Sequence, residues 1–250
     1  MKKSSVRIKP ILFFIMILAS FLLILILIKV KLFPKDDPWK EFKDILYQKE
    51  TIVHGIQEEK RAYMIISRDG RKDYGDLLVI FDKGEKGNWD RSYENDFKDL
   101  KPWKVLVADL DGDGTIEIIT AVCKTTHFDE IEKNRMFIFN YDDEKLSKKW
   151  TGSQIAGTWN DFITGDLVDI PGEELIFISE SENKNERVRV YYWFDFGFFL
   201  LAESKDYEDI ISLSIVEENR MKMVYRKQGR EEVVILMIKD GTIAEITKEQ

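Results

Sequence analysis

The sequence predicts an all-β, β-propeller-like domain of about four blades, each built from four antiparallel strands, and two observations lead to this prediction. From Thr51 onward the chain consists of short apolar or alternating runs separated by turn residues, which is the pattern of strands joined by tight turns. One segment type also recurs at about fifty-residue spacing, which is typical of four-stranded propeller blades.

The recurring segment is a pair of apolar runs around a short polar loop. It aligns without gaps four times, with the same loop position at Gly55, Asp109, Asp166 and Ser214, so successive repeats begin 54, 57 and 48 residues apart. Two further strand-like runs follow each repeat, and turns such as Asp240–Gly241 join the last pair. Because closure removes exposed strand edges, we expect a closed propeller, with an open array or a barrel as the alternative.

The beginning of the chain has a different pattern. Ile11–Ile28 carries no charge and a single polar residue, Ser20. As a helix these 18 residues would span about 27 Å, close to the thickness of a bilayer's hydrocarbon core. We therefore predict a retained transmembrane signal anchor. A cleaved signal peptide, whose apolar core is usually about 7 to 15 residues long, is the alternative.

The most distinctive loop lies in the second repeat, within the segment DLDGDGTIE. Asp109, Asp111 and Asp113 alternate there, and the intervening glycines allow a tight loop to turn all three carboxylates toward one centre. Crowded carboxylates repel one another unless a hard cation neutralises them, and oxygen ligands in a flexible loop favour calcium. We predict one Ca²⁺ cofactor; a plain Asp/Gly-rich turn without metal is the alternative.

This loop resembles the calcium loop of FG-GAP and VCBS repeats, the integrin α-like type of propeller blade, whose pattern is Asp-x-Asp-x-Asp-Gly-x-x-Asp/Glu. The resemblance implies a set of five metal ligands, of which the fourth residue contributes a backbone carbonyl: Asp109, Asp111, Asp113, Thr115 and Glu117. The third repeat keeps Asp166 and Glu174 but has Val168 and Ile170 in the middle of its loop. One calcium ion per chain is therefore expected.

The predicted domain order is a cytoplasmic N-terminus (1–10), the membrane span (11–28), a linker with a short amphipathic helix (29–50) and the β domain (51–250). Basic residues flank the span on both sides, so the positive-inside rule does not orient it. A plain calcium loop suits the millimolar calcium found outside cells. We therefore expect a single-pass membrane protein with an extracytoplasmic C-terminal domain.

Charge and motifs narrow the possible functions. The net charge of −8 argues against nucleic acid as a partner. The chain has two histidines, His54 and His127, in different repeats, and it lacks the serine-nucleophile, zinc and phosphate-loop motifs of common enzyme classes. Because a nucleophile, a base and an orienting group are not apparent, we expect no enzymatic activity.

Aromatic residues are the positive evidence for binding. They cluster at 191–199, where we select Trp193 as a partner-binding residue. Several other tryptophans fall near strand ends, and of these we select Trp159. The expected function is a membrane-anchored binding or scaffold module that engages a protein or a cell-envelope glycan. One alternative is a cell-envelope hydrolase that uses carboxylates at the propeller mouth, which requires a convergent set of polar residues from several blades. Another is an accessory subunit of a membrane complex, partnered through Ile11–Ile28.

Overall fold

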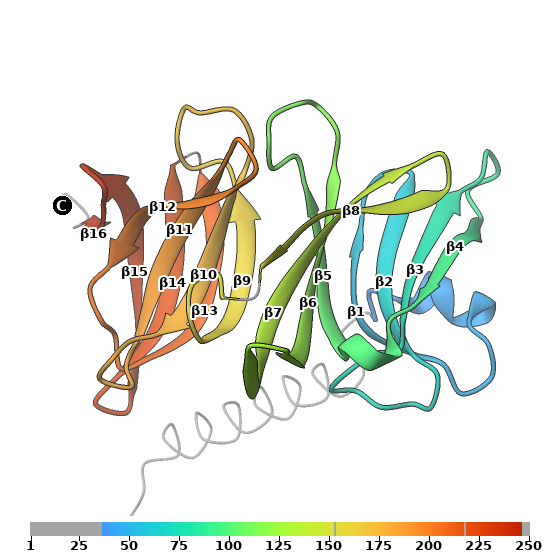
Figure 1. The fold of residues 1–250 in the computed structure, drawn as a ribbon, viewed down its shortest axis with the longest axis horizontal. Coiled ribbons are helices and arrows are strands. Elements are labelled where there is room, and N and C mark those ends of the chain that lie inside the picture. Colours follow the sequence, from blue (N-terminus) through green and yellow to red (C-terminus); the bar gives the residue numbers. More distant parts are fainter. Residues whose placement is uncertain (1–36, 153, 218, 247–250) are drawn as a thin grey trace, which may run out of the picture. The chain divides into compact units, whose positions relative to one another are not determined.

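The computed structural model describes residues 37–152, 154–217 and 219–246 (Figure 1). The predicted membrane span, Ile11–Ile28, lies outside these residues. Within the described part of the chain, no helix combines the length and the apolar character needed to cross a bilayer. The described residues belong to two units, one that ends at Asp44 and one that begins at Ile45.

The predicted amphipathic helix of the linker is a short 3-10 helix, η1 (Lys40–Ile45). Trp39 and Phe42 pack edge to face with ring centroids 6.3 Å apart. Their spacing of three residues matches the three-residue turn of a 3-10 helix, which places both rings on one side.

The domain is all-β and propeller-like, as predicted. Its described residues form sixteen strands: β1 (Thr51–Gln57), β2 (Arg61–Ser67), β3 (Leu77–Lys83), β4 (Trp89–Asp96), β5 (Pro102–Ala108), β6 (Glu117–Thr126), β7 (Asp129–Asp142), β8 (Lys145–Gly152), β9 (Trp159–Gly165), β10 (Glu174–Glu180), β11 (Glu186–Phe194), β12 (Gly197–Ser204), β13 (Asp209–Glu217), β14 (Arg220–Lys227), β15 (Arg230–Lys239) and β16 (Thr242–Ile246). A second 3-10 helix, η2 (Lys98–Leu100), separates β4 from β5. The four aligned repeats coincide with the β1–β2, β5–β6, β9–β10 and β13–β14 hairpins.

The described strands form three sheets, so two of the four predicted groups are separate sheets and the other two are joined. Strands β1–β4 and β5–β8 make two antiparallel sheets, but β9–β12 and β13–β16 share one eight-stranded sheet. The link is a short parallel pairing of β12 with β16, in which Glu203 lies opposite Thr242 and Ser204 opposite Ile243. Each of these strands would otherwise be a sheet edge with unpaired backbone groups, and their pairing removes both edges.

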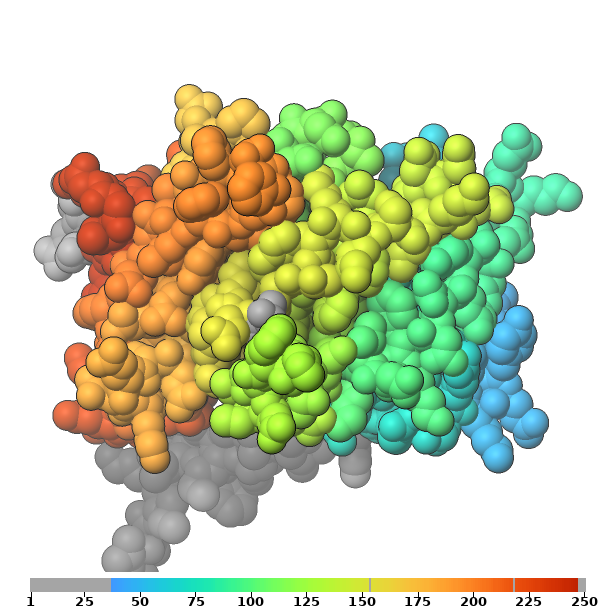
Figure 2. All heavy atoms as spheres, in the orientation of Figure 1, coloured from blue at the N-terminus to red at the C-terminus, as the bar shows by residue number. Residues whose placement is uncertain are grey.

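The first strands of successive groups lie against one another, β1 on β5, β5 on β9 and β9 on β13. We call them the inner strands. Three apolar cores fill the spaces between groups: one between the first two sheets around Ile65 and Val107, one around Met136 and Phe177, and one inside the eight-stranded sheet around Val190. On the face shown in Figure 2, the yellow-green β7–β8 hairpin lies between the teal first group and the orange strands of the third.

Candidate functional site

All four inner strands carry the same kind of irregularity near their beginnings, and in β13 the pairing register shifts between Ile210 and Ser212. The pairing register shifts between Ile52 and His54 in β1 and between Pro102 and Lys104 in β5, and the β9 register shifts between Trp159 and Asp161. Each shift leaves one extra residue, which is a β-bulge. The extra residues are Val53, Trp103, Asn160 and, in β13, Ile211. A bulge re-aims side chains and breaks the strict alternation of a strand, and bulges are frequent next to active sites.

The residues that directly follow the bulges of β1, β5 and β9 form a polar set from three different strand groups: His54, Lys104 and Asp161. The Lys104 ammonium donates to Asp161 Oδ1 at 2.5 Å and to the carbonyl of Phe162 at 2.7 Å. Lys104 is 9% exposed, whereas the Asp161 side chain is 46% exposed. A buried cation is thus fixed between backbone and carboxylate, and its carboxylate partner can be reached from solvent.

His54 completes this set. Burial, and next the positive charge of Lys104, lower its pKa to about 4, so its imidazole is neutral at pH 7. The backbone N–H of Val105 donates to His54 Nδ1 at 3.4 Å. In the tautomer that accepts this bond the proton lies on Nε2. His54 can therefore donate a hydrogen bond from Nε2 to a neighbouring acceptor.

A pocket of about 470 Å³ opens at the bulges. The extra residues of β1, β5 and β9 line it, together with residues of the β2–β3 loop and of β7: Val53, Lys72, Asp73, Tyr74, Trp103, Asn134 and Asn160. Asn134 donates through Nδ2 to the carbonyl of Trp159, and Asn160 donates to Glu186 Oε1, so both amide groups are held in place. The buried Trp103 indole N–H has no acceptor among the described residues.

The predicted calcium loop comes together in part. Asp109, Asp111 and Glu117 each offer one carboxylate oxygen, and these oxygens lie within 4.8 Å of one another. Asp113 instead accepts a hydrogen bond from the backbone N–H of Thr115 at 2.7 Å, which closes the turn. Asp111 Oδ1 is buried and has no hydrogen-bond partner among the described residues. Three of the five predicted ligands therefore fit a cation.

A lysine that the sequence did not single out also contacts this cluster. The Lys149 ammonium donates to Glu117 Oε1 at 2.7 Å and also pairs with Asp111, and it lies 5.4 Å from the centre of the Trp193 ring. This ammonium supplies the positive charge that the crowded carboxylates require. Burial raises the pKa of Glu117, although its bond to Lys149 opposes that shift.

The third repeat keeps the loop geometry and lacks the lysine. Glu174 Oε2 accepts the backbone N–H of Leu167 at 2.7 Å, as Glu117 Oε2 accepts that of Leu110 at 2.8 Å. This shared contact confirms the alignment of the two repeats. Glu174 is fully buried and its second oxygen has no hydrogen-bond partner among the described residues. Burial, and next the charge of Asp166, raise its pKa to about 7.

The structure does not support Trp159 as a partner-binding residue. Its side chain is 1% exposed and packs against Phe162 and Phe177 at centroid distances of 5.8 and 5.2 Å. Trp193 is half-buried, with Phe198 packed edge-on at 5.0 Å. The position of Trp159 directly before a bulge turns its ring into the core between β5 and β9, where Trp103 lies 6.0 Å away.

No family model and no curated protein sequence matches the chain. Among solved structures, a protein provisionally assigned as a 6-phosphogluconolactonase from Bacteroides uniformis matches with a TM-score of 0.53 at 10% identity, covering 78% of this chain and 53% of the other. A second, with the same provisional assignment and from Bacteroides fragilis, has a TM-score of 0.40 at 11% identity over 78% of this chain and 68% of its own. The chain thus spans about half the length of the first structure, and at this identity the likeness establishes the fold alone.

These comparisons correct two predictions. The predicted membership of the FG-GAP and VCBS repeat family is wrong. No family model matches the chain, and the solved structure with a similar fold is named as a lactonase. The predicted scaffold without enzymatic activity is also wrong. The neighbour in fold carries an enzyme's name, and the convergent polar set that the sequence did not reveal is present at His54, Lys104 and Asp161.

Proposed function

We propose that this chain is a hydrolase that opens a small lactone or a related ester in the pocket at the bulged inner strands. The observation that carries this proposal is the repeated bulge, which three times places a pocket-lining residue next to a member of the polar set: Val53 and His54, Trp103 and Lys104, Asn160 and Asp161. In this proposal the four strand groups act as blades whose inner strands surround the site.

The chemistry of lactone hydrolysis assigns each residue a role. Water adds to the carbonyl carbon, the ring C–O bond breaks, and the ring oxygen takes up a proton to give a hydroxy acid. Asp161 is the half-exposed carboxylate that accepts a proton from the attacking water. An ammonium has three donors, and Lys104 uses two on Asp161 and Phe162. Its third donor, with His54 Nε2–H, stabilises the oxyanion that develops on the carbonyl oxygen.

The pocket lining favours a polyhydroxylated substrate over an apolar ester. Asn134 and Asn160 offer amide oxygens, Tyr74 a hydroxyl, and Lys72 an ammonium, and Trp103 adds an aromatic surface with an unpaired donor. Such a lining satisfies many hydroxyl groups, each of which would be costly to bury without a partner. The lactonase name of the neighbour in fold agrees with this class of substrate.

The test is a substrate panel with the purified full-length chain. We expect δ-gluconolactone and its 6-phosphate to be hydrolysed at least tenfold faster than in buffer alone, and p-nitrophenyl acetate to be hydrolysed poorly. Titration of the released acid measures all three rates against the spontaneous background. Rates equal to that background for both lactones would reject the proposal.

We also propose that calcium binds Asp109, Asp111 and Glu117 in competition with Lys149. The support is the partner-free oxygen of Asp111 within a set of carboxylates that suits a hard cation. Replacing Lys149 with methionine removes the competing charge and keeps an apolar contact to Trp193. Calcium should therefore raise the melting temperature of K149M by several degrees, and that of the wild type by less.

The matched control is D111N/K149M, which removes a ligand as well as the lysine. Its melting temperature should be the same in millimolar calcium and in chelator. If calcium fails to stabilise K149M, the assignment of a calcium site at this loop is wrong.

A further inference from the structure

The loop between β2 and β3, residues 68–76, forms one wall of the proposed substrate pocket. It supplies three lining residues, Lys72, Asp73 and Tyr74, which are the only charged or hydroxyl-bearing side chains among the described residues that line the pocket. The inner strands contribute Trp103 and Asn160 to the same lining. The width of the pocket and the position of its charges therefore depend on where this loop is held.

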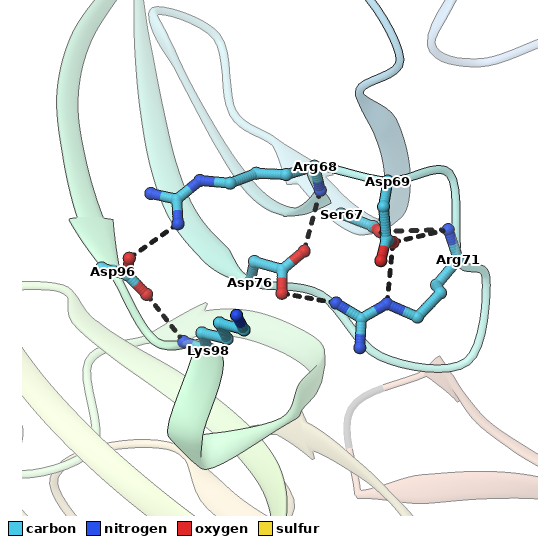
Figure 3. A network of polar contacts seen from close by, with 7 residues as sticks. All are labelled: Ser67, Arg68, Asp69, Arg71, Asp76, Asp96 and Lys98. Carbon is cyan, nitrogen blue, oxygen red and sulfur yellow. Dashed lines mark hydrogen bonds and ion pairs between the residues drawn. The ribbon is translucent and has the colours of Figure 1, made fainter.

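A buried carboxylate holds the two ends of the loop together (Figure 3). Asp76 is 2% exposed. Its Oδ2 accepts a hydrogen bond from the backbone N–H of Arg68 at 2.8 Å, and its Oδ1 accepts one from Nη2 of Arg71 at 2.6 Å. Charge-assisted hydrogen bonds to an arginine are among the strongest that a loop can make.

Arg71 is fixed a second time by the start of the loop. Its Nε donates to Asp69 Oδ1 at 2.7 Å, and its backbone N–H donates to Ser67 Oγ at 3.1 Å. Ser67 is buried and in turn donates to Asp69 Oδ1 at 2.8 Å. Arg71 thus bridges Asp69 and Asp76 across the loop (Figure 3). The next residue in the chain is the pocket-lining Lys72.

The end of the loop is tied to the inner strand that carries Trp103. The backbone N–H of Gly75 donates to the carbonyl of Pro102 at 2.6 Å. A Cβ at Gly75 would lie 2.3 Å from Ile65 Cγ2, so only glycine allows this close approach. The segment between Arg71 and Gly75 is therefore held at both ends, by a salt bridge at one and by a backbone contact at the other.

We propose that Arg71 is a positioning residue for substrate recognition: by bridging Asp69 and Asp76 it holds Lys72 and Tyr74 in the lining of the pocket. This inference rests on the proposed function, because it assigns the loop to the binding step of that reaction. Arg71 lies outside the pocket lining. Its loss should weaken substrate binding and leave the polar set at Asp161 unchanged.

The experiment compares R71Q with R71K and with a matched control, R68Q, in the full-length chain. The Arg68 side chain pairs with Glu94 and Asp96 of β4. R68Q therefore removes a similar exposed charge but keeps the Arg71 bridge and the hydrogen bond from the Arg68 backbone N–H to Asp76. Two quantities are measured: hydrogen exchange of the amides of residues 70–74 without substrate, and KM and kcat for δ-gluconolactone.

We expect R71Q to speed exchange in the loop at least tenfold and to raise KM about tenfold with kcat within twofold of the wild type. R71K should recover part of both effects, and R68Q should match the wild type. Unchanged hydrogen exchange in R71Q would show that Arg71 does not hold the loop in place. Faster exchange with an unchanged KM would show that the position of the loop does not affect substrate recognition. Failure of the proposed function would be visible separately, as a wild-type chain that does not hydrolyse the lactone.

Discussion

Replacing Trp159 with alanine should lower the free energy of unfolding by about 3 to 5 kcal/mol, the usual cost of truncating a buried tryptophan. Its ring is 1% exposed and contacts Phe162, Phe177 and Trp103 between the inner strands β5 and β9. Urea denaturation of the full-length chain, followed by tryptophan fluorescence, measures this loss.

Trp193 provides the matched control, because it is the other tryptophan that the sequence selected for partner binding. It is half-buried, so W193A should cost clearly less than W159A. A W159A variant as stable as the wild type would contradict the placement of Trp159 in the core and would restore it as a surface residue.

Replacing Glu174 with glutamine should stabilise the protein at pH 8 by roughly 3 kcal/mol and have little effect at pH 4.5. The pKa of Glu174 is raised to about 7 by burial and next by Asp166, from an ordinary value of 4.5. A tenfold change in the acid dissociation constant of a side chain corresponds to about 1.4 kcal/mol. A group whose pKa is raised on folding favours the folded state fully below its unfolded pKa. That contribution is lost as the pH rises toward 7.

The measurement is the melting temperature of wild type and E174Q at intervals from pH 4.5 to pH 8. The difference between the two should be near zero at the acidic end and grow through pH 7. Glu182, an exposed glutamate after β10, is the control position, and E182Q should show no such trend. A constant difference between E174Q and wild type would mean that Glu174 does not titrate in this range.

The sequence predicted much of the fold because its signals are local. Alternating apolar runs and turn dipeptides such as Asp240–Gly241 identified sixteen strands in four groups, and the loop alignment correctly paired Glu117 with Glu174. The pairing of β12 with β16 was not predictable, since two residue pairs decide it. Nothing in the local pattern of either strand specifies a parallel neighbour from another group.

The candidate site was less predictable than the fold. A bulge is one extra residue in a strand, and Trp103 or Asn160 looks like any other strand residue in the sequence. The sequence therefore offered His54 as an isolated histidine, although the fold brings Lys104 and Asp161 close enough to shift its pKa. Lys149 was missed for a similar reason: it lies 32 residues after Glu117 and reaches it only across the sheet.

The most direct test of the proposed site is the kcat/KM of D161N for δ-gluconolactone, measured beside the wild type and the exposed control D169N. We predict a loss of about 100-fold or more for D161N, the usual contribution of a positioned acid or base, and a fully active D169N. D161N should melt below the wild type, because the buried Lys104 loses its charged partner, and it should remain folded at the assay temperature. A D161N variant that hydrolyses the lactone as fast as the wild type would contradict a catalytic site at the bulged inner strands.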